Sequence, residues 1–355
     1  MGFEETKAEL VASPRKWVVT GVAGFIGSNL LETLLRLNQR VVGLDNLSTG
    51  HAENLEQVEA AVGPSHWRNF TWIEGDIQEP PTCRQAVDGA DYVLHEAAIG
   101  SVPRSVANPA ETNASNVTGF VNMIWASRES GVKRFVFASS SSVYGDVQAL
   151  PQMEENIGNC LSPYAVSKRV NELYADVFGR CYGMETIGLR YFNVFGPRQD
   201  PDGPYAAVIP KWISALIKGE PIFINGDGST SRDFCYVANV VQANILAATA
   251  DKQAINTIYN IALGDETSLI NLFVLLRDRL QDAYPHLRGL NPEHRPFQQG
   301  DVRFSRADIT KARRLLDYIP SHKIEHGLDE ALDWYIEMYD KSKVRNPSQP
   351  ISPVL

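Results

Sequence analysis

The sequence contains few cysteines, and none of them occurs in a pattern that binds metal. Four cysteines occur among 355 residues, at Cys83, Cys160, Cys181 and Cys235, and no two of them form a CxxC pair. This spacing disfavours a zinc site and a disulfide framework, because both need clustered or regularly spaced cysteines. Reduced thiols in a cytoplasmic protein without a metal are the simpler interpretation.

Long apolar runs and an excess of positive charge are also missing. No run approaches the roughly 20 apolar residues that a membrane-spanning helix needs. The N-terminal stretch MGFEETKAELVASPRK is charged and lacks the apolar core of a signal peptide, so we predict a short helical arm over residues 1–15. The net charge of −9 disfavours sequence-independent binding to nucleic acid, although a local pocket for an anionic ligand is compatible with it. The sequence therefore predicts a cytoplasmic protein that binds neither membrane nor nucleic acid.

What the sequence does contain is an alternation of two patterns. Apolar runs rich in β-branched residues, typical of parallel strands buried on both faces, occur at KWVVTG, RVVGLDN, FTWIEGDI, DYVLHEAA, RFVFASSSS and ETIGLRYFNVFG. Amphipathic stretches at residues 25–38, 112–130 and 164–182 lie between them and predict helices. This alternation favours an α/β fold with a doubly wound parallel sheet.

The composition changes after Gly196. Loop-forming residues dominate GPRQDPDGPYAAVIP and INGDGSTSRDF, whereas TIYNIALG predicts one more strand, and residues 269–282 and 326–339 predict helices. A chain of 355 residues is long for one domain, so about two domains are expected. We predict a first domain over residues 16–193 that is completed by about 238–264. A smaller mixed α/β domain would consist of residues 194–237 and 265–345, with a cleft between the two.

Three glycines stand at the junction of the first predicted strand and the first predicted helix. In VVTGVAGFIGSNLLETLL they are Gly21, Gly24 and Gly27. Glycine permits a tight turn and a close approach of the backbone to a pyrophosphate, and the helix N-terminus adds free N–H groups. The next strand ends in Asp45, where an acidic side chain binds the adenosine ribose and repels a 2′-phosphate. The pattern predicts a Rossmann-type domain that prefers NAD to NADP, with a purely structural turn as the alternative.

Polar residues crowd the end of the fifth predicted strand. FASSSSVYG places Ser139, Ser140, Ser141 and Ser142 where open α/β sheets bind their ligands. A polar loop with hydroxyl-to-backbone hydrogen bonds is the alternative for any one of them, and Ser141 and Ser142 in particular fit a pocket wall.

A tyrosine and a lysine follow in SPYAVSKRVNELY. Tyr164 and Lys168 are four residues apart and therefore share one face of a predicted helix. A free tyrosine has a pKa of about 10, and lowering it by about three units needs roughly 4 kcal/mol of differential interaction. Lys168 and a positive nicotinamide ring would supply this in a dry cleft, so that Tyr164 takes a proton from a substrate hydroxyl while hydride leaves the carbon. A surface pair without function is the alternative.

In this order, the glycine turn, the serine-rich strand end and YAVSK resemble the extended short-chain dehydrogenase/reductase superfamily. Within it the chain is most similar to UDP-hexose 4-epimerases, and especially to bacterial UDP-N-acetylglucosamine 4-epimerases used for surface polysaccharide precursors. The resemblance runs from about Lys16 to about Tyr339 and includes DNLSTG, GDI, HEAAIGSVPRS, SSSSVYG, SPYAVSK, LRYFNVFGPRQ, GDGSTSRDFCYV and GDVRFSRAD. It implies an isomerase that binds NAD tightly, recycles it and inverts C4 of a UDP-sugar.

The resemblance also implies a role for each matched residue. Tyr164 is the base and acid, Lys168 orients the nicotinamide ribose, and Ser140, beside Ser141, hydrogen-bonds the reacting hydroxyl. The cofactor residues are Gly21, Gly24, Phe25, Ile26 and Gly27 at the pyrophosphate, Asp45, Asn46, Ser48 and Gly50 at the adenosine ribose, Asp76 and Ile77 at the adenine, Ala97, Ala98 and Asn116 along the channel, and Phe192 near the nicotinamide. The residues that face the UDP-sugar are Gly100, Ser101, Arg104, Ser140, Ser142, Tyr164, Asn193, Ala207, Val208, Lys211, Phe223, Ile224, Asn225, Arg232, Asp301, Arg303 and Ser305.

Two positions near the end of the match bear on the substrate. Where the family reads Arg-x-Gly-Asp, this chain has Gln298-Gln299-Gly300-Asp301. Either Arg295 or Arg303 replaces the missing diphosphate arginine, which is our hypothesis, or the affinity for UDP is lower. Ser305 stands where relatives restricted to non-acetylated sugars tend to carry a bulky tyrosine. Its small side chain leaves room for a 2-acetamido group and, with GSVPRS, predicts UDP-GlcNAc and UDP-GalNAc as substrates.

Other functions on the same scaffold stay open. The nearest alternatives are a UDP-Glc/UDP-Gal 4-epimerase, a UDP-uronic acid 4-epimerase and a UDP-glucuronate decarboxylase. The two that act on charged sugars stay open because Arg104 is able to bind a carboxylate. A 4,6-dehydratase is disfavoured, because Ser140, Ser141 and Ser142 stand where it would need acidic residues. A non-catalytic NAD-binding sensor or scaffold is the alternative from a different class. Family likeness further implies a homodimer, formed through a four-helix bundle of residues 112–130 and 164–182.

Overall fold

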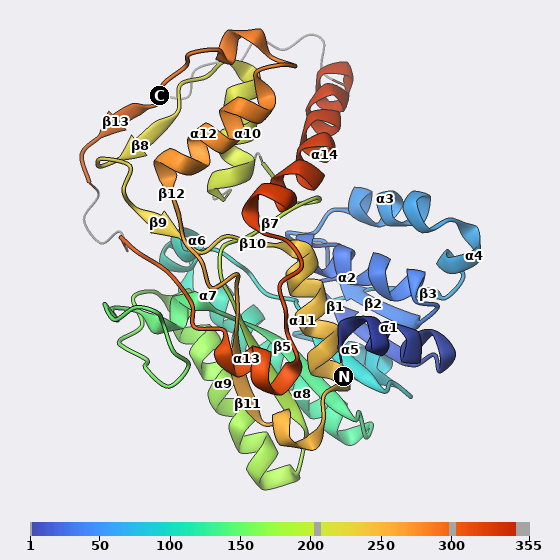
Figure 1. Cartoon of the computed structure of the whole chain (residues 1–355). Helices are drawn as coiled ribbons and strands as arrows, with labels where there is room; N and C mark the ends of the chain where they lie inside the picture. The colour runs from blue at the N-terminus through green and yellow to red at the C-terminus, as the bar shows by residue number, and fades with distance from the viewer. Residues whose placement is uncertain (1, 202–206, 298–302, 346–355) are drawn as a thin grey trace.

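Seven parallel strands form the central sheet of the computed structural model, which describes residues 2–201, 207–297 and 303–345 (Figure 1). Their spatial order is β11-β6-β5-β4-β1-β2-β3, so the chain runs outward from β1 to β3 and then continues from β4 on the other side of β1. This confirms the predicted doubly wound α/β fold. Such a sheet binds ligands beyond the carboxyl ends of its strands, at the reversal between β1 and β4. The strands are β1 Lys16–Thr20, β2 Arg40–Asp45, β3 Phe70–Glu74, β4 Tyr92–His95, β5 Arg134–Ser140, β6 Thr186–Tyr191 and β11 Thr257–Ile261.

Helices cover both faces of the sheet and bury its apolar strands. One face carries α2 (Phe25–Arg36) and α11 (Val237–Thr249), whose side chains share an apolar cluster with β1 and β6. The opposite face carries α5 (Pro80–Val87), α8 (Phe120–Glu129) and α9 (Pro163–Tyr182), which form a second cluster. Every residue of β5 is buried, as a near-continuous apolar run between two helix layers predicts. Shorter or peripheral helices are α3 Ala52–Val62, α4 Pro64–Trp67, α6 Val102–Ala107, α7 Pro109–Asn113 and α13 Thr310–Leu316.

The N-terminal stretch forms the predicted helix, α1 (Phe3–Ala12), and it packs against the first domain. Leu10 is buried in the same cluster as α2 and α11. The side chain of Gln39 donates a hydrogen bond to the Leu10 carbonyl at 2.9 Å. These contacts show a docked helix where an arm was predicted.

Two predicted elements are divided in the structure. The predicted helix at residues 112–130 consists of the end of α7, a π-helix over Ala114–Gly119, and α8. At the π-helix Asn116 turns inward, where its amide bonds both the N–H and the carbonyl of Ile99. The predicted strand ETIGLRYFNVFG breaks after β6, because Asn193 adopts a positive φ of 31° before β7 (Val194–Phe195).

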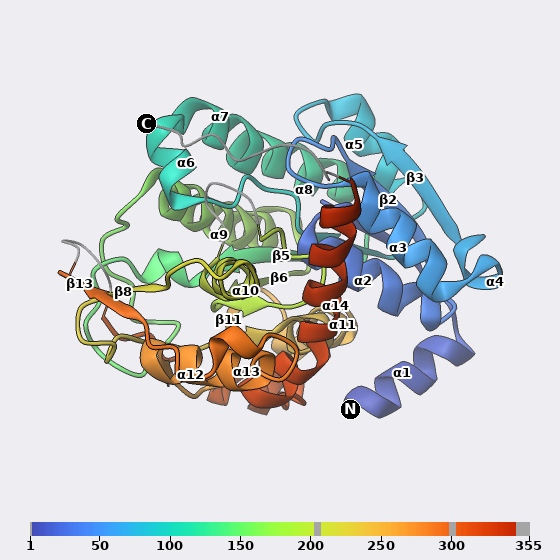
Figure 2. The same ribbon diagram turned by 90° about the horizontal axis from the view of Figure 1, so that it is seen from above.

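A smaller layer lies above the sheet and has its own apolar cluster (Figures 1 and 2). Three helices supply most of it: α10 Val208–Lys218, α12 Leu269–Leu280 and α14 Ile324–Arg345. Its strands are short and occur in pairs, with β7 beside β10 (Cys235–Tyr236), β8 (Phe223–Asn225) beside β13 (Glu293–Arg295), and β9 (Ser231–Arg232) beside β12 (Thr267–Ser268). Helical segments at Ser141–Tyr144, Lys252–Ala254 and Pro285–Leu287 complete the described elements.

The described residues contain neither a membrane-spanning helix nor a cluster of metal-binding side chains. None of the described helices has both the length and the apolar character that crossing a membrane requires. Within the described ranges, no three His, Cys, Asp or Glu side chains come together in a group that could hold a metal ion.

Candidate active site

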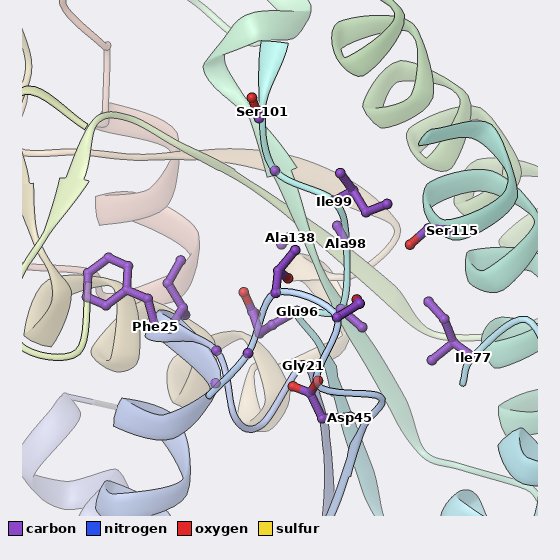
Figure 3. A pocket seen from close by; sticks show the side chains of 18 of the residues that line it. Gly21, Phe25, Asp45, Ile77, Glu96, Ala98, Ile99, Ser101, Ser115 and Ala138 are labelled. Atoms are coloured by element: carbon purple, nitrogen blue, oxygen red, sulfur yellow. The ribbon is translucent and has the colours of Figure 1, made fainter. Parts of the chain in front are cut away.

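A cavity of about 650 Å³ opens at the carboxyl ends of the parallel strands (Figure 3). Figure 3 shows Phe25 on one side of it, Ile99 and Ser115 on the other, and Gly21, Glu96 and Ala138 between them. Sheet topology brings these residues together, because strands that are distant in the sequence end at the same edge. The strand ends that line it are Gly21 after β1, Asp45 in β2, Gly75 and Asp76 after β3, Glu96 and Ala97 after β4, Ser139 and Ser140 in β5, and Tyr191 in β6.

The glycine turn has the geometry of a pyrophosphate cradle. Gly21 adopts a positive φ of 68°, and a Cβ at Gly27 would lie 2.1 Å from the Gly21 carbonyl oxygen. Helix α2 then begins after Gly24 without a capping side chain, which leaves its first N–H groups free for an anion. Phe25 and Ile26 line the cavity beside these glycines. The residues present therefore fit the diphosphate of a dinucleotide.

Asp45 and its neighbours form the predicted adenosine end. The Asp45 carboxylate accepts hydrogen bonds from the backbone N–H groups of Ala23 at 3.0 Å and Leu47 at 2.9 Å. Burial raises the pKa of Asp45, and these N–H groups act against that rise. A carboxylate held in this way suits a ribose hydroxyl and disfavours a phosphate. The other predicted residues that line this end are Asn46, Ser48, Gly50, Asp76 and Ile77.

Tyr164 and Lys168 enter the cavity from the start of α9. This helix begins where the hydroxyl of Ser162 accepts a hydrogen bond from the N–H of Ala165 at 3.1 Å. Lys168 is only 4% exposed, and its Nζ donates to the Ala138 carbonyl at 2.8 Å. Ser140 hydrogen-bonds the Tyr164 phenol. A phenol, a hydroxyl and an ammonium thus meet in one cavity, as predicted.

The predicted acidity of Tyr164 depends on the bound cofactor. Burial raises the pKa of Tyr164; the hydrogen bond from Ser140 acts against this, and the negative charge of Glu96 adds to it. Lys168 itself has a pKa lowered by burial to about 8, and it donates to a neutral carbonyl. Without the positive charge of a nicotinamide ring, the phenol therefore keeps its proton at neutral pH.

The serine-rich strand end is divided between the cavity and the wall behind it. Ser139 and Ser140 line the cavity. Ser141 and Ser142, expected to contribute to catalysis and to sugar binding, start the short helix after β5 and lie outside the lining. The N–H of Ser142 donates to the Ser140 hydroxyl at 3.1 Å, which fixes the orientation of Ser140.

A buried ion pair holds the elements of this end together. Glu172, two turns beyond Tyr164 on α9, accepts from Arg190 of β6 at 2.8 and 2.9 Å. It also accepts from the hydroxyl of Ser139 in β5 at 2.7 Å. The pair therefore connects the helix that carries Tyr164 and Lys168 to the two strands whose ends line the cavity.

Two predicted cofactor residues are not brought to the cavity. Phe192 is fully buried against Tyr144, while its neighbours Tyr191 and Asn193 line the cavity. Phe192 follows the end of β6, and its ring packs into the apolar core between the sheet and α11. Asn116 is buried behind Ile99 and supports the wall, whereas Ala97 and Ala98 line the cavity as predicted.

The predicted sugar-facing residues are only partly gathered. Gly100, Ser101, Arg104, Asn193 and Ala207 line the cavity. Asp301 and its neighbours Gln298 and Gln299 lie outside the described residues. The remaining predicted residues belong to the smaller layer and lie outside the lining: Val208, Lys211, Phe223, Ile224, Asn225, Arg232, Arg303 and Ser305.

Sequence reasoning missed several residues that line the cavity. Glu96 and Tyr191 belong to motifs that resemble the family, but neither was assigned a role. Their positions at the ends of β4 and β6 were the available signal. His51 and Asp200 also line the cavity and approach each other to 3.8 Å from separate loops, which no local pattern indicates.

Comparison with known proteins agrees with this arrangement. The model of the NAD dependent epimerase/dehydratase family matches residues 17–262. The UDP-glucose 4-epimerase of Mycolicibacterium smegmatis is 36% identical over 320 residues, which cover 90% of this chain and 97% of that protein.

Two solved structures extend the comparison. The UDP-N-acetylglucosamine 4-epimerase of Methanobrevibacter ruminantium, in complex with UDP-N-acetylmuramic acid, is 38% identical with a TM-score of 0.83, and the match covers 92% of this chain and 99% of that one. The UDP-glucuronic acid 4-epimerase of Bacillus cereus, in complex with UDP-glucuronic acid and NAD, is 28% identical with a TM-score of 0.80, and the match covers 91% and 100%. The chain therefore belongs to the NAD-dependent epimerase/dehydratase family, and NAD is its cofactor.

Proposed function

We propose that this protein is a UDP-sugar 4-epimerase that interconverts UDP-GlcNAc and UDP-GalNAc. The observation that carries the proposal is the meeting of Tyr164, Ser140 and Lys168 in the cavity that fits a dinucleotide. An acid–base phenol at the nicotinamide end is what oxidation of a sugar hydroxyl requires. The family membership and the three relatives described above support 4-epimerisation as the reaction.

The proposed cycle leaves the redox state unchanged. Bound NAD supplies a hydride acceptor for the sugar C4 and later returns the same hydride. Tyr164, as the phenolate, accepts the proton of the C4 hydroxyl while the C4–H bond breaks, and Ser140 holds the oxygen. Once the 4-keto sugar has turned its other face, Tyr164 gives the proton back to the C4 oxygen. Lys168 holds its position through the Ala138 carbonyl, with its remaining N–H groups available to the cofactor ribose.

The choice of acetylated sugar rests on the small side chain of Ser305. The relatives themselves are divided, because their names specify UDP-glucose, UDP-N-acetylglucosamine and UDP-glucuronic acid. Ser305 is 7% exposed, and the Ala307 N–H two residues later is bonded to Asp233. A side chain of this size would leave volume for a 2-acetamido group. UDP-Glc/UDP-Gal and UDP-uronic acids are the alternative substrates, and Arg104 in the cavity wall favours testing the uronic acids.

The direct test is incubation of the purified protein with UDP-GlcNAc in the absence of added NAD. The anomeric proton signals are followed by NMR, and a UDP-GalNAc signal would show 4-epimerisation with a retained and recycled cofactor. No product, even after NAD is added, would reject this substrate, and UDP-Glc, UDP-Gal and the uronic acids would be tested next. If none of them reacts while NAD stays bound, the sensor or scaffold alternative replaces the proposal.

We also propose that the protein forms a homodimer through α8 and α9. Val166, Leu173 and Val177 on α9 are 48%, 49% and 41% exposed, and they lie at helical spacing on one side of it. Trp125 of α8 and Tyr182 of α9 add an exposed aromatic pair with ring centroids 5.7 Å apart. An apolar helix face of this kind marks an interface in many soluble proteins. Light scattering should give twice the chain mass for the wild type and the monomer mass for Val177→Glu; a wild-type monomer would reject the proposal.

A further inference from the structure

Glu96 is a carboxylate in the cavity wall that the proposed cycle does not use. It follows β4 directly, and its backbone N–H donates to the Thr20 carbonyl of β1 at 3.3 Å. Its side chain shares the cavity with Tyr164 and Lys168. An acidic group at the reacting end of a dinucleotide site influences every charge that forms there.

A chain of hydrogen bonds fixes the carboxylate of Glu96. The hydroxyl of Tyr191 donates to Glu96 Oε1 at 2.9 Å. The amide of Asn244 in α11 donates to that hydroxyl at 2.8 Å and to the Val240 carbonyl at 2.9 Å. The position of the Glu96 carboxylate is therefore fixed by Tyr191 of β6 and, through Tyr191, by Asn244 of α11.

Lys168 needs an opposing charge, and Glu96 is placed to provide it. Lys168 is 4% exposed, and its Nζ donates to the neutral carbonyl of Ala138. A buried ammonium that has only neutral partners is costly to keep charged. The charge of Glu96 is the one that acts on Lys168 in favour of its protonated form.

We propose that Glu96 is a positioning residue that sets the charge of the Tyr164/Lys168 pair. Its carboxylate keeps both groups protonated to higher pH than they would be without it, so the pH range in which the site works depends on Glu96. The inference rests on the proposed function for its catalytic meaning, but its test does not depend on turnover.

The direction in which Glu96 shifts the pKa values of Lys168 and Tyr164 follows from the charges of these groups. Burial raises the pKa of Glu96 to about 7, and the hydrogen bond from Tyr191 and the charge of Lys168 act against this rise. Burial lowers the pKa of Lys168 to about 8, and Glu96 acts against this fall. Glu96 also adds to the raised pKa of Tyr164. Removing its negative charge must lower both values.

Three other titratable groups near Glu96, the side chains of His95, Tyr191 and Cys235, do not change charge near neutral pH. Burial lowers the pKa of His95 to about 3, so this ring is neutral. Burial raises the pKa of Tyr191 well above its ordinary value, and it also raises the pKa of Cys235 behind it. Of the groups named here, Glu96 and Lys168 are therefore the two that titrate near neutral pH.

The test is a pH titration of the NAD-loaded protein without any sugar substrate. Tyrosinate absorbance is recorded for the wild type and for Glu96→Gln, and the signal of Tyr164 is isolated by subtracting the same titration with Tyr164→Phe present. We expect the Tyr164 phenolate to appear at lower pH in Glu96→Gln. In activity profiles, the alkaline loss of activity should begin at lower pH in the variant. An unchanged phenolate midpoint would overturn the inference.

Tyr191→Phe provides the matched variant. It removes the donor to Glu96, so Glu96 stays protonated to higher pH and the phenolate midpoint should move in the same direction by a smaller amount. Added to Glu96→Gln, it should cause no further shift, because it acts only through Glu96. Glu79→Gln, an exposed carboxylate outside the cavity lining, should leave the titration unchanged. If no UDP-sugar reacts, the proposed function fails while this titration still decides the inference.

Discussion

The two ends of the cavity are built in different ways. At the cofactor end, the lining residues lie at the ends of six strands of one sheet, and their positions follow from the order of those strands. Many of the predicted sugar-facing residues lie outside the lining, on α10, on strands of two or three residues that pair across long separations, such as β8 with β13, or in the loop that contains Arg303 and Ser305. A sheet edge places side chains by its own regularity, whereas loops need many independent contacts to do the same. We therefore expect substitutions at the cofactor end to have larger and more specific effects.

The largest expected effect comes from the phenol. Tyr164→Phe removes the proposed acid–base group and should lower kcat by about 10²–10⁴-fold, while the NAD content of the purified protein stays the same. Tyr174→Phe, on the exposed side of the same helix, is the control and should keep full activity. Turnover and cofactor content are measured on the same preparations. Retained turnover in Tyr164→Phe would show that another group moves the proton.

The ion pair beneath the cofactor end should matter for folding. Glu172→Ala leaves the buried Arg190 guanidinium without its carboxylate, and we expect the free energy of unfolding to fall by about 3–5 kcal/mol. Urea denaturation measures this. Glu172→Gln keeps the shape and part of the hydrogen bonding, so its loss should be smaller. Equal stability of the wild type, Glu172→Ala and Glu172→Gln would mean that the Glu172–Arg190 ion pair does not hold α9 to the sheet.

At the sugar end, Ser305→Tyr tests the steric argument. The bulky ring should cost about 1–3 kcal/mol of binding for acetylated substrates, which is about 5- to 150-fold in kcat/KM. UDP-Glc and UDP-Gal, where they are accepted, should be affected little. Ser305→Ala is the control that keeps the volume small. If acetylated and plain sugars lose activity equally, with unchanged thermal stability, then Ser305 does not select the sugar.

Asp45 tests the cofactor end for selectivity. Asp45→Asn removes a charge-assisted bond to the adenosine ribose, and NAD affinity should fall by about tenfold. Affinity for NADP should rise relative to NAD, because the repulsion of its 2′-phosphate is gone. Calorimetry on cofactor-stripped protein measures both, with the exposed Asp88→Asn as control. An unaltered NAD-to-NADP ratio would contradict the role of Asp45.

The smallest effect is expected at the arginines that would replace the diphosphate residue. The guanidinium of Arg303 lies 4.2 Å from the ring centre of Phe297, and that of Arg295 lies 3.3 Å from the ring centre of Phe223. Changing the arginine that binds the phosphates to Ala should weaken UDP binding by about fivefold, because a solvent-exposed charge contributes little. Arg288→Ala, elsewhere on the surface, is the control. Unaltered UDP affinity in both Arg303→Ala and Arg295→Ala would end this hypothesis.

The sequence predicted the cofactor end of the cavity better than its sugar end. The glycine turn, Asp45 and the Tyr164/Lys168 pair were identified because each lies at a strand end or on the first turns of a helix, where local spacing has geometric meaning. The role of Phe192 stays a prediction: its side chain is buried outside the lining, and the motif does not show which of Tyr191 and Phe192 points toward the cavity. The acidity of Tyr164 also depends on groups that the local motif does not show, because burial and the charge of Glu96 both raise its pKa. Burial depends on the whole fold and leaves no local signal.

The sequence by itself determined the doubly wound sheet, the family and the cofactor, and it placed Tyr164 and Lys168 on one helix face as the predicted acid–base pair. These follow from alternating apolar periodicity and from motifs in which a few consecutive residues form one structural unit. Only the tertiary structure decided that Ser139 and Ser140 face the cavity while Ser141 and Ser142 do not, and that Tyr191 and Asn244 hold Glu96 beside Lys168. Those arrangements depend on distances between segments far apart in the chain and on how deeply each group is buried. Both are fixed only when the helices and strands pack together.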